Sequence, residues 1–163
     1  MRLVPAELPL LEAALESDAA LGRELGGIEV APGWESGEPE AVRFTRDAVA
    51  ADPESVRWGT RLFIDGDPET MVGWGGFKGP PKRGTVELGY AIAPDHRGQG
   101  LATRAVGELV AEAHEAGEVR AVIAHTLPEH NASTRVLEKS GFAFDGEAEE
   151  DGIQVWRWRL RRA

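Results

Sequence analysis

The sequence contains no cysteine among its 163 residues. This absence excludes disulfides, thiolate nucleophiles, zinc–thiolate sites and iron–sulfur clusters. It also contains no run that approaches the roughly 20 apolar residues needed for a membrane-spanning helix. Glu7 and Glu12 interrupt the apolar N-terminal stretch, which therefore does not resemble a secretory signal, and the expected location is the cytoplasm.

Positive charge is scarce, because 18 Lys and Arg stand against 28 Asp and Glu and give a formal net charge of −10. Such a charge repels phosphate backbones and argues against nucleic acid as a partner, while cationic or amine-bearing partners are attracted. No membrane partner is expected either. Hydrophobic residues make up 42% of the chain, enough for a sizeable core, and no linker or repeat divides residues 1–163. We therefore expect a single domain.

Periodicity predicts helices in the first third of the chain and strands in the middle. Apolar residues recur at helical spacing over Leu8–Leu15 and Ala41–Ala51, and a loop rich in Gly and Pro, residues 26–37, lies between them. The middle contains three strand-like segments, the first two flanking an Asp-Gly-Asp-Pro turn: Arg61–Ile64, Met71–Phe77 and Thr85–Ile92.

The second half alternates between the two kinds of element. The expected order is a helix over Leu101–Ala116, a buried strand over Val119–Ala124, a helix ending at Gly141, and a hairpin of Phe142–Ala148 with Ile153–Leu160. Either Asn131 or Ser133 caps the second helix. This order predicts a single-domain α/β fold with a mixed, mostly antiparallel sheet and helices on both faces.

The most informative segment is the glycine-rich turn between the strand Thr85–Ile92 and the helix after it. It reads Arg97-Gly98-Gln99-Gly100-Leu101-Ala102. Glycines let the backbone approach a ligand closely, and the first turn of a helix offers unpaired N–H groups at the positive end of its dipole. Such a turn suits a phosphate or pyrophosphate. The alternative is an ordinary tight turn without a ligand.

Two widespread phosphate-binding motifs do not fit this turn. A P-loop requires Gly-Lys-Ser/Thr, which the chain lacks. A dinucleotide-binding fingerprint requires glycine where Thr103 stands, and an acidic residue at the end of the next strand, where His125 stands.

Arg97, Gly100 and Ala102 instead fit the pattern Arg/Gln-x-x-Gly-x-Gly/Ala. The segment resembles the coenzyme-A-binding motif of the GNAT superfamily of N-acetyltransferases. A second segment, Asn131–Phe142, resembles the next conserved helix of that family and the start of the strand after it. Ser133 matches the helix serine of the RimJ/RimL-like branch, which acetylates ribosomal-protein N-termini.

The resemblance implies that acetyl-CoA is the acetyl donor and indicates where it binds. The backbone N–H groups of Arg97–Ala102 would hold the pyrophosphate, and the pantetheine arm would pair with the backbone around Ile92. Family members commonly carry a bulge in this strand, which opens a gap for the thioester. Asn131 would face the pantetheine, but many relatives have this asparagine one position earlier, where His130 stands; Asn131 would then be only a helix cap.

The candidate base is Glu87, which stands where family members often keep a carboxylate for this task. An ammonium must lose a proton before it can attack a thioester, and burial would raise the pKa of Glu87 into a useful range. The alternative is that Glu87 is an outward-facing strand residue.

The candidate acids are Tyr90 and Ser133. The family often protonates the leaving thiolate with a tyrosine on the second-motif helix, where this chain has Leu137, and Tyr90 is its only tyrosine. Period-two alternation puts Tyr90 and Glu87 on opposite faces unless a bulge lies between them. A thiol with a pKa of about 8.5 can also leave without an acid.

No metal site is predicted, because His125 and His130 have no third ligand at suitable spacing. Two acidic, loop-like segments, Trp34–Glu40 and Glu147–Asp151, correspond to loops that flank the acceptor cleft in the family. Within the first, Trp34 is expected to form part of the wall of that cleft. Their carboxylates would attract a cationic amine.

The sequence thus predicts an acetyl-CoA-dependent N-acetyltransferase without a metal. The acetyl group would pass directly to a primary amine, either a small cationic amine or a protein N-terminus, because no cysteine can carry it. The alternative is a CoA-binding sensor or partner module without catalysis, which the missing helix tyrosine favours. The sequence leaves the acceptor open, and also whether the chain forms a homodimer.

Overall fold

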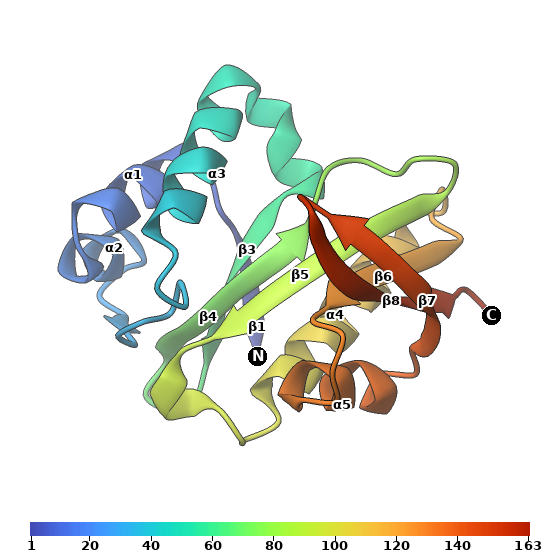
Figure 1. The fold of residues 1–163 in the computed structure, drawn as a ribbon. Coiled ribbons are helices and arrows are strands. Elements are labelled where there is room, and N and C mark those ends of the chain that lie inside the picture. Colours follow the sequence, from blue (N-terminus) through green and yellow to red (C-terminus); the bar gives the residue numbers. More distant parts are fainter.

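Eight strands form one sheet in the computed structural model, which describes residues 1–163 (Figure 1). The strands are β1 (Arg2–Pro5), β2 (Glu29–Val30), β3 (Thr60–Asp65), β4 (Thr70–Phe77), β5 (Thr85–Ile92), β6 (Ala121–Thr126), β7 (Ala143–Glu150) and β8 (Ile153–Arg161). Their spatial order is β1-β3-β4-β5-β6-β8-β7, and β2 pairs with β4 beside this path. Only the β5–β6 and β2–β4 pairs are parallel. The predicted mixed, mostly antiparallel sheet is therefore confirmed.

Helices cover both faces of this sheet. They are α1 (Leu8–Glu16), α2 (Asp18–Glu24), α3 (Pro39–Ala51), α4 (Leu101–Glu115) and α5 (Ala132–Lys139), with 3₁₀ turns η1 (Pro53–Trp58) and η2 (Pro94–His96). None of these helices has the length and apolar character that crossing a membrane would demand.

The strand β3 shows how the two faces are filled. Leu62 and Ile64 point into a core shared with α1, α2 and α3, whereas Phe63 between them points into the core beneath α4 and α5. This alternation is what a strand buried on both faces produces. The three N-terminal helices and the two later helices therefore lie on opposite sides of the sheet (Figure 1).

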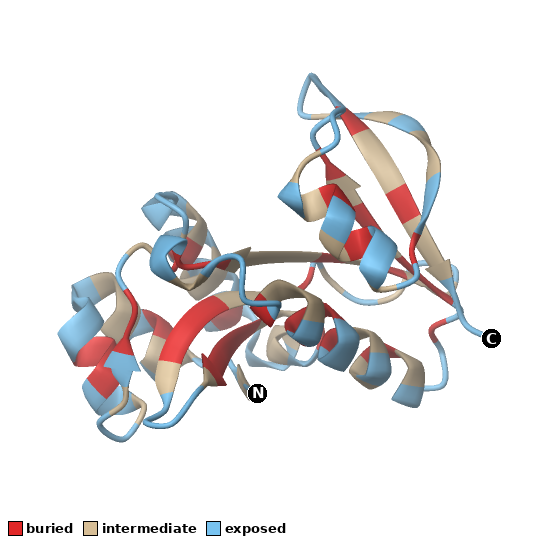
Figure 2. Ribbon diagram, turned by 90° about the horizontal axis from the view of Figure 1, so that it is seen from below, coloured by how far each residue is buried: buried red, intermediate tan, exposed pale blue.

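The sheet opens between β5 and β6. These strands pair only over Thr85–Glu87 and Ala121–Ile123, after which they separate. The C-terminal strands consequently stand away from the rest of the sheet in Figure 2. The register between β4 and β5 contains no shift, so the opening arises without the bulge in β5 that the family resemblance implied.

Three features of the first and last parts of the chain differ from the prediction. The short strands β1 and β2 were not predicted, and β2 lies in the segment expected to be a loop. The acidic segment expected to be a loop is mostly strand, because β7 continues to Glu150. Only Asp151 and Gly152 form the turn, with φ values of 50° and 78° that suit a two-residue hairpin loop.

Candidate active site

The turn between β5 and α4 is built from glycines in the left-handed region. Gly98 and Gly100 have φ values of 75° and 78°, and a Cβ placed on either would meet no atom within 4 Å. Gly100 is the N-cap of α4 and supplies no side chain to cap it. The space above this turn is therefore open to a ligand.

The N–H groups of this turn have no partner within the protein. From Gly98 to Thr103 none of them donates a hydrogen bond to the backbone or to a side chain. A row of free N–H groups at the positive end of a 15-residue helix is the arrangement that binds phosphate groups. The predicted turn thus fits a pyrophosphate.

The backbone of β5 faces the opening at every second residue. Lys78 N donates to the Glu87 carbonyl oxygen (2.9 Å), so Glu87 and every second residue after it bond to β4. Tyr90 and Ile92 therefore turn their peptide groups toward β6. The Ile92 carbonyl oxygen already accepts from Arg97 Nε (3.0 Å). The N–H group of Ile92 is therefore the one left for a ligand.

Helix α5 lies on the far side of the opening, and Asn131 caps it. The Asn131 Oδ1 atom accepts from Thr134 N (3.0 Å), and Thr134 Oγ1 accepts from Asn131 N (2.9 Å). This capping box decides between the two predicted caps in favour of Asn131. The ring of His130 instead packs edge-on against Trp156, with centroids 5.1 Å apart.

The two candidate acids meet across the opening. The Tyr90 hydroxyl, on β5, donates to the carbonyl oxygen of Ser133, on α5, over 3.3 Å. Burial raises the pKa of Tyr90 to about 12. Because β5 has no bulge, Tyr90 and Glu87 lie on opposite faces of the sheet, as alternation predicted.

Glu87 lies at the centre of a polar cluster on the other face. Its Oε1 atom is 2.8 Å from His125 Nδ1 and 2.9 Å from Lys78 Nζ. Burial acts to raise the pKa of Glu87, but the hydrogen bonds from His125 and Lys78 and the charge of Lys78 outweigh it and lower that pKa. The prediction of a raised pKa for Glu87 was therefore wrong.

Glu150 completes this cluster from β7. Its carboxylate lies 3.5 Å from Lys78 Nζ and 3.8 Å from His125 Nδ1. Glu87, His125 and Glu150 each offer an atom within 4.8 Å of the others. The Lys78 ammonium already contacts both carboxylates, and their charge raises its pKa against the effect of burial. We therefore assign the cluster as an ion-pair network.

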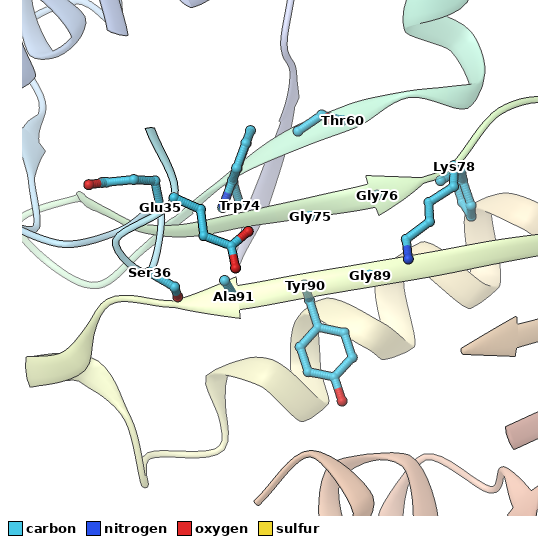
Figure 3. A pocket seen from close by; sticks show the side chains of 12 residues that line it. Glu35, Ser36, Thr60, Trp74, Gly75, Gly76, Lys78, Gly89, Tyr90 and Ala91 are labelled. Atoms are coloured by element: carbon cyan, nitrogen blue, oxygen red, sulfur yellow. The ribbon is translucent and has the colours of Figure 1, made fainter. Parts of the chain in front are cut away.

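A cavity of about 380 Å³ lies on the same face as the cluster (Figure 3). Its floor includes Gly76 and Gly89, and Lys78 stands at one edge, where a Cβ on Gly89 would meet its Cε atom at 3.5 Å. Glu35 and Glu38 line it from the loop that precedes α3, so the first acidic segment does border a cavity.

The tryptophan expected in the cavity wall lies behind it. Trp34 is only 2% exposed, and its Nε1 donates to Asp18 Oδ1 (3.0 Å). Its ring meets that of Trp74 edge-on at 5.2 Å, and Trp74 lines the cavity. Trp34 therefore supports the wall without forming its surface.

Sequence reasoning missed Lys78 and assigned no role to His125. A signal for His125 was present, because this polar residue directly follows the apolar residues Ala121–Ala124 of the predicted buried strand. Its contact with Glu87 depends on the parallel pairing of β5 with β6, which spans 38 residues of chain.

Comparisons with known proteins agree with this arrangement. Residues 2–143 match the model of the acetyltransferase (GNAT) domain. The chain is 28% identical over 152 residues to the uncharacterized N-acetyltransferase YjdG of Bacillus subtilis, covering 92% of this chain and 90% of that protein.

Solved structures share the fold at low sequence identity. A GNAT-family acetyltransferase from Bordetella pertussis superposes with a TM-score of 0.68 at 20% identity, covering 96% of this chain and 93% of that one. The microcin C7 self-immunity acetyltransferase MccE, solved in complex with acetyl-CoA and AMP, gives 0.67 at 15% identity over 98% and 91%. Since the family model spans most of the sequence and relatives of that family share its sheet, the chain belongs to the GNAT acetyltransferases and is an acyltransferase.

Proposed function

We propose that this protein transfers the acetyl group of acetyl-CoA directly to a primary amine. The observation that carries the proposal is the opening between β5 and β6. It has a row of free N–H groups at one end and a polar cluster beside a cavity on one face. One side suits an anionic donor and the other suits an amine acceptor.

The proposed donor site follows the edge of the opening. The N–H groups from Gly98 to Ala102 would hold the pyrophosphate, and the N–H of Ile92 would pair with the pantetheine. The N–H of Arg97, which the resemblance included, already donates to the Pro94 carbonyl oxygen (3.4 Å). Asn131 can add its amide NH₂ group, since its oxygen already accepts from Thr134 N in the cap. The acetyl-CoA found in the complex of MccE supports this assignment, because that protein has the same fold.

The proposed acceptor site is the cavity beside Glu87. Glu35 and Glu38 line it, and the carboxylates of Glu87 and Glu150 exceed the positive charge that Lys78 brings. A cationic amine is therefore attracted to this face. We propose a small cationic amine or a protein N-terminus as the acceptor, and the Ser133 match to the RimJ/RimL-like branch supports the latter.

The proposed chemistry needs a base on the cavity face and little help for the leaving group. Glu87, the predicted base, belongs to the cluster that would take the ammonium proton. Tyr90, which also lines the cavity, directs its hydroxyl toward Ser133 on α5, and these two residues would lie beside the leaving thiolate. With a pKa of about 12, Tyr90 keeps its proton, and its single hydrogen would have to turn from the Ser133 carbonyl oxygen to be donated to the thiolate.

A panel of amines tests the function. The protein is mixed with acetyl-CoA and a polyamine, a basic peptide with a free N-terminus, or an acidic amino acid, and released thiol is measured. We expect the first two to give turnover well above hydrolysis and the third to give least. Calorimetric binding of CoA without turnover of any amine would support the alternative, a sensor or partner module without catalysis.

Three further expectations accompany this proposal. Turnover should survive dialysis against a chelator, because no step needs a metal. The protein should fractionate with the cytoplasm of its cell. Sedimentation would decide between a monomer and a homodimer, and residues 1–163 should unfold in one transition if they form a single domain.

A further inference from the structure

We propose that His125 takes the proton from the acceptor ammonium and that Glu87 holds the imidazole in position. Glu87 is then a positioning residue and His125 is the catalytic base. This inference rests on the proposed acetylation of an amine, and it names the atom that receives the proton, His125 Nε2.

The first argument is the position of His125 in the sheet. Glu87 pairs with Ile123 at the last paired position of β5 and β6. Gly89 and His125 are each two residues further along their strands, so they share the Glu87 face and lie where the strands have separated. Gly89 forms part of the cavity floor. By register His125 is therefore on the wall of the opening at the level of Gly89, beside the residues that line the cavity, whereas Glu87 lies in the closed part.

The second argument is the hydrogen bond between the two side chains. An ionised carboxylate can only accept, so the 2.8 Å contact with Glu87 requires the hydrogen to be on His125 Nδ1. The lone pair of the neutral imidazole is then on Nε2, which bonds to no protein group and is not closed off from solvent. A second donor, Lys78, also occupies the Glu87 carboxylate, which makes it a weak base.

The third argument is the charge around the imidazole. Glu87 faces it from β5 and Glu150 from β7, the latter at 3.8 Å, while Lys78, which follows β4, contacts both of these carboxylates. Arg157 is its register partner on β8, and its charge is matched by Asp145 at 3.0 Å. The two carboxylates nearest the ring favour a positive charge there, so the imidazole can hold the proton it accepts.

The proposed step balances without a further reactant. The ammonium gives one proton to His125 Nε2, and the freed nitrogen lone pair forms the C–N bond to the thioester carbonyl carbon. The C–S bond breaks with its electron pair on sulfur, and the second amine proton passes to that sulfur. The products are the acetylated amine, the free thiol and the imidazolium, which releases its proton to water.

A spectrum of the protein alone gives the first test. Nitrogen-15 NMR of histidine-labelled protein at pH 8, with the His125 signals identified by their loss in His125→Gln, reports which ring nitrogen carries the hydrogen. We expect the Nδ1–H form, and its loss in Glu87→Ala, which removes the acceptor. An Nε2–H form in the wild-type protein would overturn the proposal.

Kinetics give the second test. His125→Gln should lower kcat by roughly 10²–10⁴-fold and remove the acidic limb of the kcat–pH profile, which a base that must be deprotonated produces. Glu87→Gln should lower kcat but keep the limb. His114→Gln, on α4 and remote from the cluster, should match the wild type. Unchanged CoA affinity and melting temperature would confirm that the variants fold.

These outcomes distinguish a failure of this inference from a failure of the proposed function. If the wild type turns over amines while His125→Gln retains kcat and the limb, His125 is not the base. If Glu87→Gln removes the limb and His125→Gln keeps it, Glu87 is the base. If the wild type turns over no amine although it binds CoA, the proposed function itself fails.

Discussion

Replacement of Gly100 by valine should weaken CoA binding strongly while the protein stays folded. Gly100 has a φ of 78°, so a side chain there costs roughly 1–2 kcal/mol of stability, which is a fall in melting temperature of about 2–8 °C. The valine would fill open space above the N–H groups that we assign to the pyrophosphate. A hydrogen bond to a charged group contributes roughly 1.5–3 kcal/mol. Loss of two such bonds would weaken binding by about 10²–10⁴-fold.

The control for this variant is at the other end of the same helix. Gly117 has a φ of 77°, and a Cβ there would also meet no atom within 4 Å. Gly117→Val should therefore lose similar stability and bind CoA as the wild type does. Calorimetry measures both affinities. Equal CoA affinities for the two folded variants would show that the Gly100 turn does not hold the pyrophosphate.

Three further predictions concern stability, the acceptor and the leaving group. Asp65 is partly buried, which acts to raise its pKa, but hydrogen bonds and charge from the N-terminal ammonium and Arg104 outweigh this effect and lower it. The stabilisation that ionised Asp65 provides is present above its pKa in the unfolded chain and is lost as the pH falls through its pKa in the folded protein. Asp65→Asn should therefore lower the free energy of unfolding, measured in urea, by about 1–3 kcal/mol at pH 7 and by little at pH 2. The double variant Glu35→Gln/Glu38→Gln should have a higher KM for a cationic amine than the wild type at low salt, and 0.5 M salt should remove this difference in KM. An unchanged KM at low salt would mean that these carboxylates do not attract the acceptor. Tyr90→Phe should lower kcat by less than about tenfold, since a phenol with a pKa of about 12 keeps its proton; a larger loss in stopped-flow assays would restore Tyr90 as the acid.

Local patterns sufficed for most of the fold. The apolar stripe of α4 and the left-handed Gly117 after it depend only on neighbouring residues, so periodicity placed that helix to within one residue. The same holds for β5, whose predicted and observed bounds coincide. The strand β1 could not be predicted, because four residues carry no period and its partner, β3, lies about 60 residues away.

The site was predictable only in part for the same physical reason. The phosphate turn is a local motif, so its residues could be named from sequence. The environment of Glu87 is set by Lys78, His125 and Glu150, which lie after β4, on β6 and on β7. Burial alone suggested a raised pKa, and these distant partners reverse its direction.

The most direct test of the central claim is a single-turnover experiment with protein in excess over acetyl-CoA and a cationic amine present. Samples are quenched over time, and mass spectrometry follows the acetylated amine, the free thiol and the intact protein. Direct transfer predicts that acetylated amine and thiol appear at the same rate while the mass of the protein stays constant. Acetylated protein that forms before the product, or bound acetyl-CoA that stays intact in the presence of every amine, would contradict the account.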